Sequence, residues 1–318
     1  MINSVNALPS FASIMFRAAL KRDNHAQFPP TFDRLPHKSF LFTAANLAHF
    51  SKAKIERFHS VTHWQGTFLH PCYLHVVSFP LHMMLMLEKE FPFSLLGLVH
   101  IHNEITQYRP IRANEGCVFH CYFKDMKAHP KGVVFSIATD VRVNEELCWS
   151  SVSTNLYRDA TLSAPEGKAQ GASPNAQDEC PQDECHYTGQ KQESWYLGEN
   201  VGRKYAQASG DFNPIHLTRV TAKLFGFKQA IAHGMWSKSR CLSAIEQAAP
   251  EIFEQSFNTQ VQFIKPAMLP SNVQFTMCEN SAETTQQNLA TRRAFSLTSK
   301  AKHGANSSPH LSGELIAF

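Results

Sequence analysis

The sequence lacks a long hydrophobic run. Its most apolar stretch, residues 81–87, is only seven residues long and includes His82, whereas a membrane-spanning helix needs about 20 consecutive apolar residues. The first residues also lack a basic region followed by an apolar core, which is the pattern of a secretory signal. We therefore expect no membrane span and a cytoplasmic protein.

A strong charge imbalance and a metal-binding cysteine pattern are also absent. The formal net charge of +4 is too small to predict a nucleic-acid-binding protein, although it suits a partner that carries phosphate groups. The eight cysteines have neither the spacing of metal ligands nor the density of a small disulfide-rich scaffold. We expect free thiols in a reducing compartment.

Composition divides the chain into four parts. Residues 159–192 are rich in Ala, Gln, Gly, Ser, Pro and acidic residues and contain the duplication QDEC-P-QDEC, which is typical of a flexible linker. We interpret Cys180 and Cys185 in this segment as thiols of a tether rather than metal ligands. The predicted parts are a leader at 1–38 with a short docking helix at 8–20, a first domain at 39–158, the linker at 159–192, and a second domain at 193–318.

Hydrophobic patterns predict the same order of elements in both domains, a helix followed by antiparallel strands. The first domain has a helical pattern at 74–87 that contains Pro80, and a turn at 144–146. The second has a helical pattern that begins at Gly234 and ends before Pro250. This order predicts an α+β fold in which each antiparallel sheet wraps around a central helix. The predicted strands are 97–108, 118–123, 132–143, 148–157, 257–264, 272–278, 293–299 and 311–318.

One segment of the second domain carries the clearest chemistry. Asp211 and His216 lie five residues apart, with Asn213-Pro214 between them. A proline disfavours helix at the residue before it, so Asp211 should lie on an irregular segment before a helix at 215–225 that ends at Gly226. A rigid turn can bring the two side chains together, and a carboxylate and an imidazole that share one water can move its protons.

The residues SGDFNPIH at 209–216 and GFKQAIAHGM at 226–235 closely resemble the MaoC-like (R)-specific enoyl-CoA hydratase/dehydratase family, which has the hotdog fold. The resemblance is strongest over 195–270, weaker over 40–158, and does not cover the linker or the first residues. It implies two hotdog domains in one chain, of which the second keeps the catalytic motif. It also implies that Asp211 and His216 activate water and that the N–H of Gly234 binds the thioester oxygen.

The implied reaction is the reversible hydration of trans-2-enoyl thioesters to (R)-3-hydroxyacyl thioesters, with coenzyme A or acyl carrier protein as part of the substrate. No metal or redox cofactor is implied. A hotdog acyl thioesterase and a non-catalytic subunit that binds acyl thioesters are the alternatives. The family also suggests a homodimer, although two hotdog halves in one chain weaken that expectation.

The other candidate residues have simpler explanations beside the functional one. Asp211 is also a favoured helix cap, and His216 alone would pass for a surface histidine. His100 and His102 share a strand face that suits a metal, but no third ligand is evident, so we predict no metal there. Tyr205 fits core packing as well as a pocket wall, and Ser209 and Asn213 fit a turn. The candidate substrate-binding residues are Ser209, Asn213, His233 and Met235, and the candidate phosphate contacts are Arg203, Lys204, Lys228 and Lys265.

Overall fold

The computed structural model describes residues 2–21, 37–44, 51–95, 97–162, 187–280, 291–299 and 307–318. The chain forms two compact units that are each discontinuous in sequence. Within the described residues, no helix is both long and apolar enough to cross a membrane. The first unit comprises residues 1–49, 75–103 and 114–175, and the second comprises 50–74, 104–113 and 176–318.

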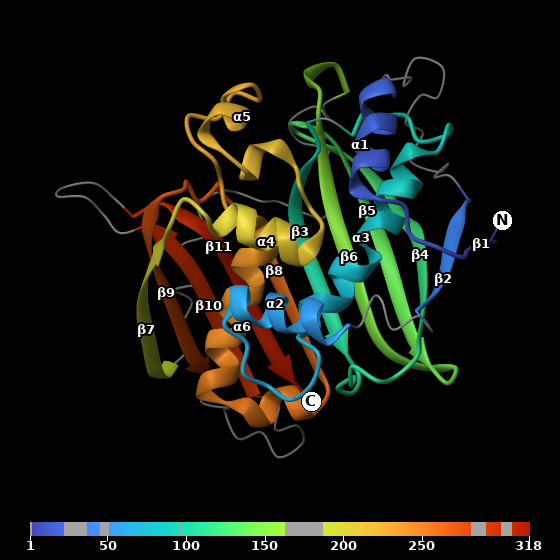
Figure 1. Cartoon of the computed structure of the whole chain (residues 1–318). Coiled ribbons are helices and arrows are strands. Elements are labelled where there is room, and N and C mark those ends of the chain that lie inside the picture. The colour runs from blue at the N-terminus through green and yellow to red at the C-terminus, as the bar shows by residue number, and fades with distance from the viewer. Residues whose placement is uncertain are drawn as a thin grey trace. The chain divides into compact units, whose positions relative to one another are not determined.

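The first unit is a mostly antiparallel sheet with one long helix on its face (Figure 1). The helix α3 carries Pro80 in its interior, and His82 on it hydrogen-bonds Thr139 of β5 at 2.7 Å. Strands β5 and β6 are joined at Asn144 and Glu145, which both have positive φ, as a two-residue hairpin turn requires. The strand order is β1-β2-β4-β5-β6-β3, with β1 Ile2–Val5, β2 Ser39–Ala44, β3 Val99–Gln107, β4 Cys117–His129, β5 Gly132–Val143 and β6 Glu146–Arg158, beside α1 Phe11–Leu20, α3 Pro71–Leu87 and η1 Ala160–Leu162.

The boundary between the units falls inside two elements. The first residues of α3, up to Leu74, and the last residues of β3, after Asn103, belong to the second unit. That unit repeats the arrangement, with an antiparallel sheet and the central helix α6 (Figure 1). Helix α6 is buried along most of its length, and α2 packs against α4. The strand order is β8-β11-β10-β9-β7, with β7 Tyr187–Leu197, β8 Phe257–Phe263, β9 Ser271–Asn280, β10 Thr291–Ser299 and β11 Pro309–Ala317, beside α2 Lys52–Thr62, α4 Val201–Ser209, η2 Pro214–His216, α5 Arg219–Lys223, α6 Gly234–Ala248 and η3 Pro250–Glu254.

The structure confirms the α+β fold, the predicted strands to within a few residues at most ends, and the docking helix within 8–20 as α1. The predicted helix at 215–225 was wrong, because the chain forms η2 and then α5 instead. Thr218 caps the N-terminus of α5 with a capping box, in which its side chain and that of Thr221 each accept a backbone N–H. This cap starts a new helix after η2 instead of continuing it. Gly226 does stop the segment, with φ of 83°.

The end of the predicted linker was also wrong. Strand β7 begins at Tyr187, inside the range 159–192, because its alternation of polar residues suits an edge strand and resembles linker composition. Cys180 and Cys185, with the rest of 163–186, lie outside the described residues. The domain ranges 39–158 and 193–318 remain predictions, while the compact units assign 50–74 and 104–113 to the second unit. Strands β1 and β2 and helices α2 and α4 were not predicted.

Candidate active site

The segment that carries Asp211 begins where α4 ends. Gly210 has φ of 79° and its N–H bonds the carbonyl of Ala206, which is the left-handed stop that glycine supplies at least cost. Asp211 follows, and its N–H donates to Oγ of Ser209 at 3.1 Å. The chain therefore leaves the helix in a fixed direction and presents the Asp211 side chain, which is 24% exposed.

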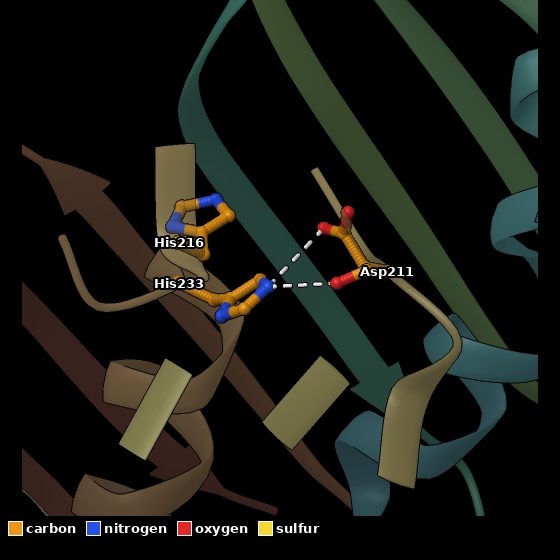
Figure 2. A group of neighbouring side chains, drawn as sticks. All are labelled: Asp211, His216 and His233. Carbon is orange, nitrogen blue, oxygen red and sulfur yellow. Dashed lines mark hydrogen bonds and ion pairs between the residues drawn. The ribbon is translucent and has the colours of Figure 1, made fainter. Parts of the chain in front are cut away.

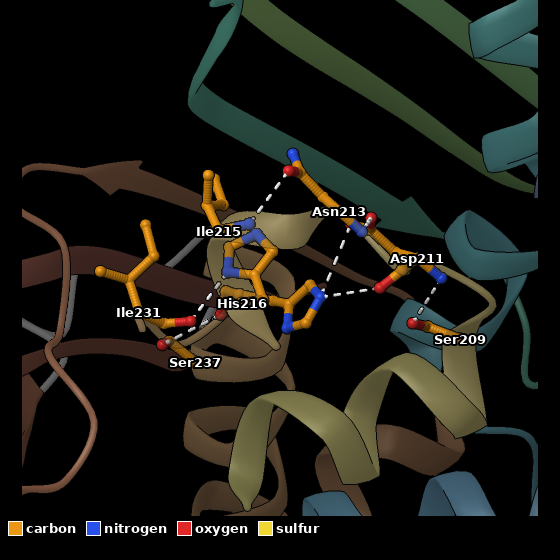
Figure 3. A network of polar contacts seen from close by, with 8 residues as sticks. Ser209, Asp211, Asn213, Ile215, His216, Ile231 and Ser237 are labelled. Atoms are coloured by element: carbon orange, nitrogen blue, oxygen red, sulfur yellow. Dashed lines mark hydrogen bonds and ion pairs between the residues drawn. The ribbon is translucent and has the colours of Figure 1, made fainter. Parts of the chain in front are cut away.

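A pair of side-chain-to-backbone turns then fixes the chain between Asp211 and His216 (Figure 3). Oδ1 of Asp211 accepts the N–H of Asn213 at 3.1 Å, and Oδ1 of Asn213 accepts the N–H of Ile215 at 3.4 Å. Pro214 then begins η2, in which the N–H of His216 bonds the carbonyl of Asn213 at 3.0 Å. These bonds use Oδ1 of Asp211 to hold the turn and do not involve Oδ2.

Two contacts set the position of His216. Its Nδ1 lies 2.8 Å from the carbonyl oxygen of Ile231, and because a carbonyl only accepts, Nδ1 carries the proton and Nε2 is the basic nitrogen of the neutral ring. Helix α4 approaches the backbone of His216 so closely that a Cβ on Gly202 would lie 1.9 Å from the His216 carbonyl oxygen. Only glycine fits there.

His233, the residue before α6, links the two halves of the motif (Figure 2). Its Nε2 donates to the backbone carbonyl of Asp211 at 3.0 Å and lies 3.8 Å from Oδ2 of Asp211, which is too long for a hydrogen bond. Its ring stacks on that of His216 with centroids 3.7 Å apart. On another side it meets the buried ring of Tyr205 at 4.8 Å. His233 therefore positions both members of the pair.

Burial shifts the pKa values of Asp211 and His216 in the directions that favour their uncharged forms. Burial raises the pKa of Asp211, and the nearby His216 and the N–H of Asn213 offset part of that rise. Burial lowers the pKa of His216, against the opposing effects of Asp211 and the Ile231 carbonyl. The pKa of His233 is held well below its usual value by burial and then by His216. A neutral imidazole near a carboxyl group of raised pKa is suited to proton transfer near neutral pH.

The N-terminus of α6 lies beside this pair. Gly234 is the first helical residue after His233, and the first N–H groups of a helix have no partner within it, so they can stabilise a developing oxyanion. A Cβ on Gly234 would lie 3.0 Å from two ring atoms of Phe263, so a side chain here would crowd that ring. Met235 is buried in the same turn.

Asp211, His216 and His233 are also the one group among the described residues whose ligand atoms lie close enough to consider a metal, within 4.8 Å of one another. Their orientation does not suit one. The two imidazole planes are stacked at 26°, and a metal lies along the in-plane lone pair of each histidine ligand, so nearly parallel stacked rings do not converge on one ion. Nε2 of His233 is moreover a donor to a carbonyl.

The structure brings Asp211 and His216 together, as the motif predicted, and places His233 beside both, with Gly234 next in the chain. Ser209 and Asn213 bond the backbone of the turn, and Tyr205 packs among aromatic rings; a substrate-binding role for Ser209, Asn213, His233 and Met235 remains a prediction. Sequence reasoning missed Gly202 and the carbonyl of Ile231. A glycine inside a helical pattern signals close approach in general, but nothing local identifies its partner.

Comparison with known proteins assigns this site to a family. The model of the MaoC like domain matches residues 177–300. The 3-hydroxyacyl-thioester dehydratase X of Mycobacterium tuberculosis is 30% identical over 220 residues, which cover 69% of this chain and 73% of that protein. The chain belongs to the MaoC-like dehydratase family. It is a hydro-lyase.

Solved structures agree with this assignment. The crystal structure of HtdX from Mycobacterium tuberculosis superposes with a TM-score of 0.61 and 26% identity, covering 86% of this chain and 98% of that one. A conserved Mycobacterium tuberculosis protein with a double hotdog fold gives 0.54 at 10% identity, covering 91% and 98%. A MaoC-like dehydratase from Phytophthora capsici gives 0.62 at 15%, covering 88% and 95%. The last two support the double hotdog fold alone.

Proposed function

We propose that this hydro-lyase adds water reversibly to trans-2-enoyl thioesters and forms (R)-3-hydroxyacyl thioesters. The related protein named above is a 3-hydroxyacyl-thioester dehydratase, which catalyses the reverse direction of the same chemistry. The stereochemistry and the role of the pair are proposals that the family suggests. The reaction needs no redox cofactor, since adding water to a double bond changes no overall oxidation state.

The observation that carries the proposal is the fixed tautomer of His216. Nδ1 is committed to the carbonyl of Ile231, so Nε2 is the basic nitrogen of a ring that has a nitrogen within 4.8 Å of a carboxylate oxygen of Asp211. One water can bond to both groups at that separation, because each hydrogen bond spans about 2.6–3.2 Å. Asp211 and His216 titrate as a coupled pair, so the proton transfers belong to the pair.

In the hydration direction, the pair takes one proton from the water while the water oxygen bonds to C3 of the enoyl group. The electrons of the double bond move toward the thioester, and the resulting enolate oxygen is held by the N–H of Gly234 at the start of α6. A proton from the pair then adds to C2. Helix α6 contributes further, since its N-terminus is favourable for negative charge.

The test follows the enoyl-thioester absorbance of crotonyl-CoA with wild type, Asp211→Asn and His216→Ala. We expect each variant to lose at least about a hundredfold in turnover, which is the usual contribution of general acid–base catalysis, with an unchanged circular dichroism spectrum. The exposed carboxylate of Glu251 on η3 offers a matched control, because Glu251→Gln removes the same charge away from the site.

Free thiol is measured in the same reactions. Loss of the enoyl band without release of thiol supports hydration, while release of thiol from a saturated acyl-CoA would indicate a thioesterase. Near-wild-type turnover by Asp211→Asn or His216→Ala would overturn the assigned roles. Chiral analysis of the 3-hydroxyacyl product tests the (R) configuration independently.

A further inference from the structure

The second unit contains a cavity that involves none of Asp211, His216 and His233. Its volume is about 640 Å³, within the range of roughly 300–1,000 Å³ that is usual for small-molecule sites. Its wall is built from α2, the end of β7, the segment that leads into α4, α4 itself and α6. We call it the α2–α4 cavity.

The cavity wall is positively charged. Arg57 of α2, Lys204 of α4 and Arg240 of α6 all line it, and Glu199 is the one carboxylate among the described residues of the wall. Arg57 and Lys204 are exposed. Arg57 donates to the carbonyl of Gln207 at 3.4 Å, a long hydrogen bond that leaves most of its donors to other partners. Three cations from three helices line a wall with one carboxylate, and Glu193, outside the wall, pairs with Arg240. One positive charge is left in excess, so the wall favours an anion.

Arg240 is the most buried of these cations, with a side chain only 10% exposed. Its guanidinium lies 4.1 Å from the ring centroid of Trp195, which fixes its plane. Nη2 lies 3.8 Å from Oε2 of Glu193, beyond hydrogen-bonding distance. Nη1 is buried and has no hydrogen-bond partner among the described residues. An unpaired buried guanidinium nitrogen is costly. Nη1 itself is not open to the cavity, and Arg240 contributes the positive charge of its guanidinium to the wall.

The start of α4 adds a second feature that favours anions. The side-chain oxygen of the N-cap residue Asn200 accepts from Arg203 and makes no bond to the first turn. That turn also contains no acidic residue. The N–H groups at a helix N-terminus carry partial positive charge and commonly bind phosphate. Asn200 and Val201 both line the cavity. The N–H of Val201 is already bonded to the carbonyl of Gly198, so this helix end favours an anion through its partial positive charge rather than through that N–H.

We propose that the α2–α4 cavity binds a phosphorylated nucleoside. Phosphate oxygens suit the forked donors of Arg57 and Arg240 and the point charge of Lys204. Tyr196 also lines the cavity and is 68% exposed, so its ring offers a face on which a base can stack. The volume is far larger than a single phosphate ion requires, and it accommodates the base and the sugar as well.

Two sources supply this chemistry. A free nucleotide would act at a site separate from catalysis, while the nucleotide end of a coenzyme A thioester would be part of the substrate. The second source rests on the proposed function, and the first does not. Binding is therefore measured without turnover, so that this proposal and the hydratase proposal fail separately.

Adenosine 3′,5′-bisphosphate is the probe, titrated against the full chain by calorimetry and by tryptophan fluorescence. Trp195 and Trp236, two of the four tryptophans, line the cavity. We expect saturable binding that Arg57→Glu and Lys204→Glu each weaken at least about tenfold, the scale of one charge-assisted contact. Lys223→Glu makes the same charge change at an exposed residue of α5 outside the cavity and should leave the affinity unchanged.

Absence of saturable binding at millimolar probe would overturn the proposal, and so would an equal loss of affinity in Lys223→Glu. Competition then identifies the source. If the site holds the nucleotide end of the substrate, the bisphosphate raises KM for crotonyl-CoA, and Arg57→Glu raises it for crotonyl-CoA but not for crotonyl-pantetheine. If the ligand is a free nucleotide, saturating crotonyl-CoA leaves binding of the bisphosphate unchanged.

Discussion

Gly202 makes the sharpest prediction, because this residue of α4 lies directly against the backbone of His216. The substitution Gly202→Ala would place a Cβ 1.9 Å from the carbonyl oxygen of His216 and 3.0 Å from its carbonyl carbon. Both atoms belong to the backbone, so no side chain can rotate away. Cβ contacts shorter than 3.0 Å are essentially never seen, and α4 and η2 must therefore separate by about 1 Å or more.

The magnitude follows from that displacement. A misplacement of about 1 Å at a catalytic group can cost about a hundredfold in rate, so we expect hydration of crotonyl-CoA to fall by about that factor. Overpacking of this kind costs typically about 1–3 kcal/mol in stability. Alanine is favoured over glycine in a helix by up to about 1 kcal/mol, and this gain is too small to offset the clash. The free energy of unfolding should fall.

The assay pairs initial hydration rates with urea unfolding of the same preparations. Gly116→Ala is the matched control, because a Cβ there meets nothing within 4 Å. It should leave both the rate and the unfolding midpoint at wild-type values. The reasoning is refuted if Gly202→Ala hydrates crotonyl-CoA at the wild-type rate with an unchanged unfolding midpoint.

Two further predictions follow from buried histidines. His233→Leu removes the donor to the Asp211 carbonyl and should lower kcat at least about tenfold, while His233→Gln, whose amide can reach the same oxygen, should recover part of it; equal loss in both variants would contradict a positioning role. Burial lowers the pKa of His70 and of His82 from 6.5 to about 3 each. Both stay neutral in the folded chain while the unfolded chain binds protons below about pH 6.5, so stability is lost as pH falls from about 6.5 toward about 3, by about 2 kcal/mol for each at pH 5. Urea unfolding at pH 7.5 and pH 5 measures this loss, and His82→Gln should reduce it by about 2 kcal/mol; an unchanged loss would contradict the assignment.

Local sequence signals predicted the elements that have a strong period or a strong terminator. Strand β5 was predicted at its observed bounds, and the positive φ of Asn144 and Glu145 agrees with the predicted turn. The start of α6 at Gly234 and the stop at Gly226 were also confirmed. These features depend on residues that are neighbours in the sequence, where alternation, capping and glycine conformation act directly.

The elements that were missed depend on distant partners. Helix α2 has few buried residues, and α4 is short, so their sequences alone carry weak helical signals; they are stabilised by packing against each other and by bonds such as the one from Trp236 to the Val61 carbonyl. Strand β7 has the polar composition of a linker. It forms a strand because its partner β9 supplies the hydrogen bonds of the ladder.

Near neighbours in the sequence were enough to predict the Asp211 and His216 pair and the turn that presents it. Asp211, Asn213, Pro214 and His216 lie within six residues, and the bonds that shape this turn run between near neighbours. Which nitrogen of His216 is basic depends on the folded chain, because the carbonyl that fixes its tautomer belongs to Ile231, fifteen residues away. The charged cavity likewise depends on the folded chain, since side chains from α2, α4 and α6 meet only after packing brings those helices together.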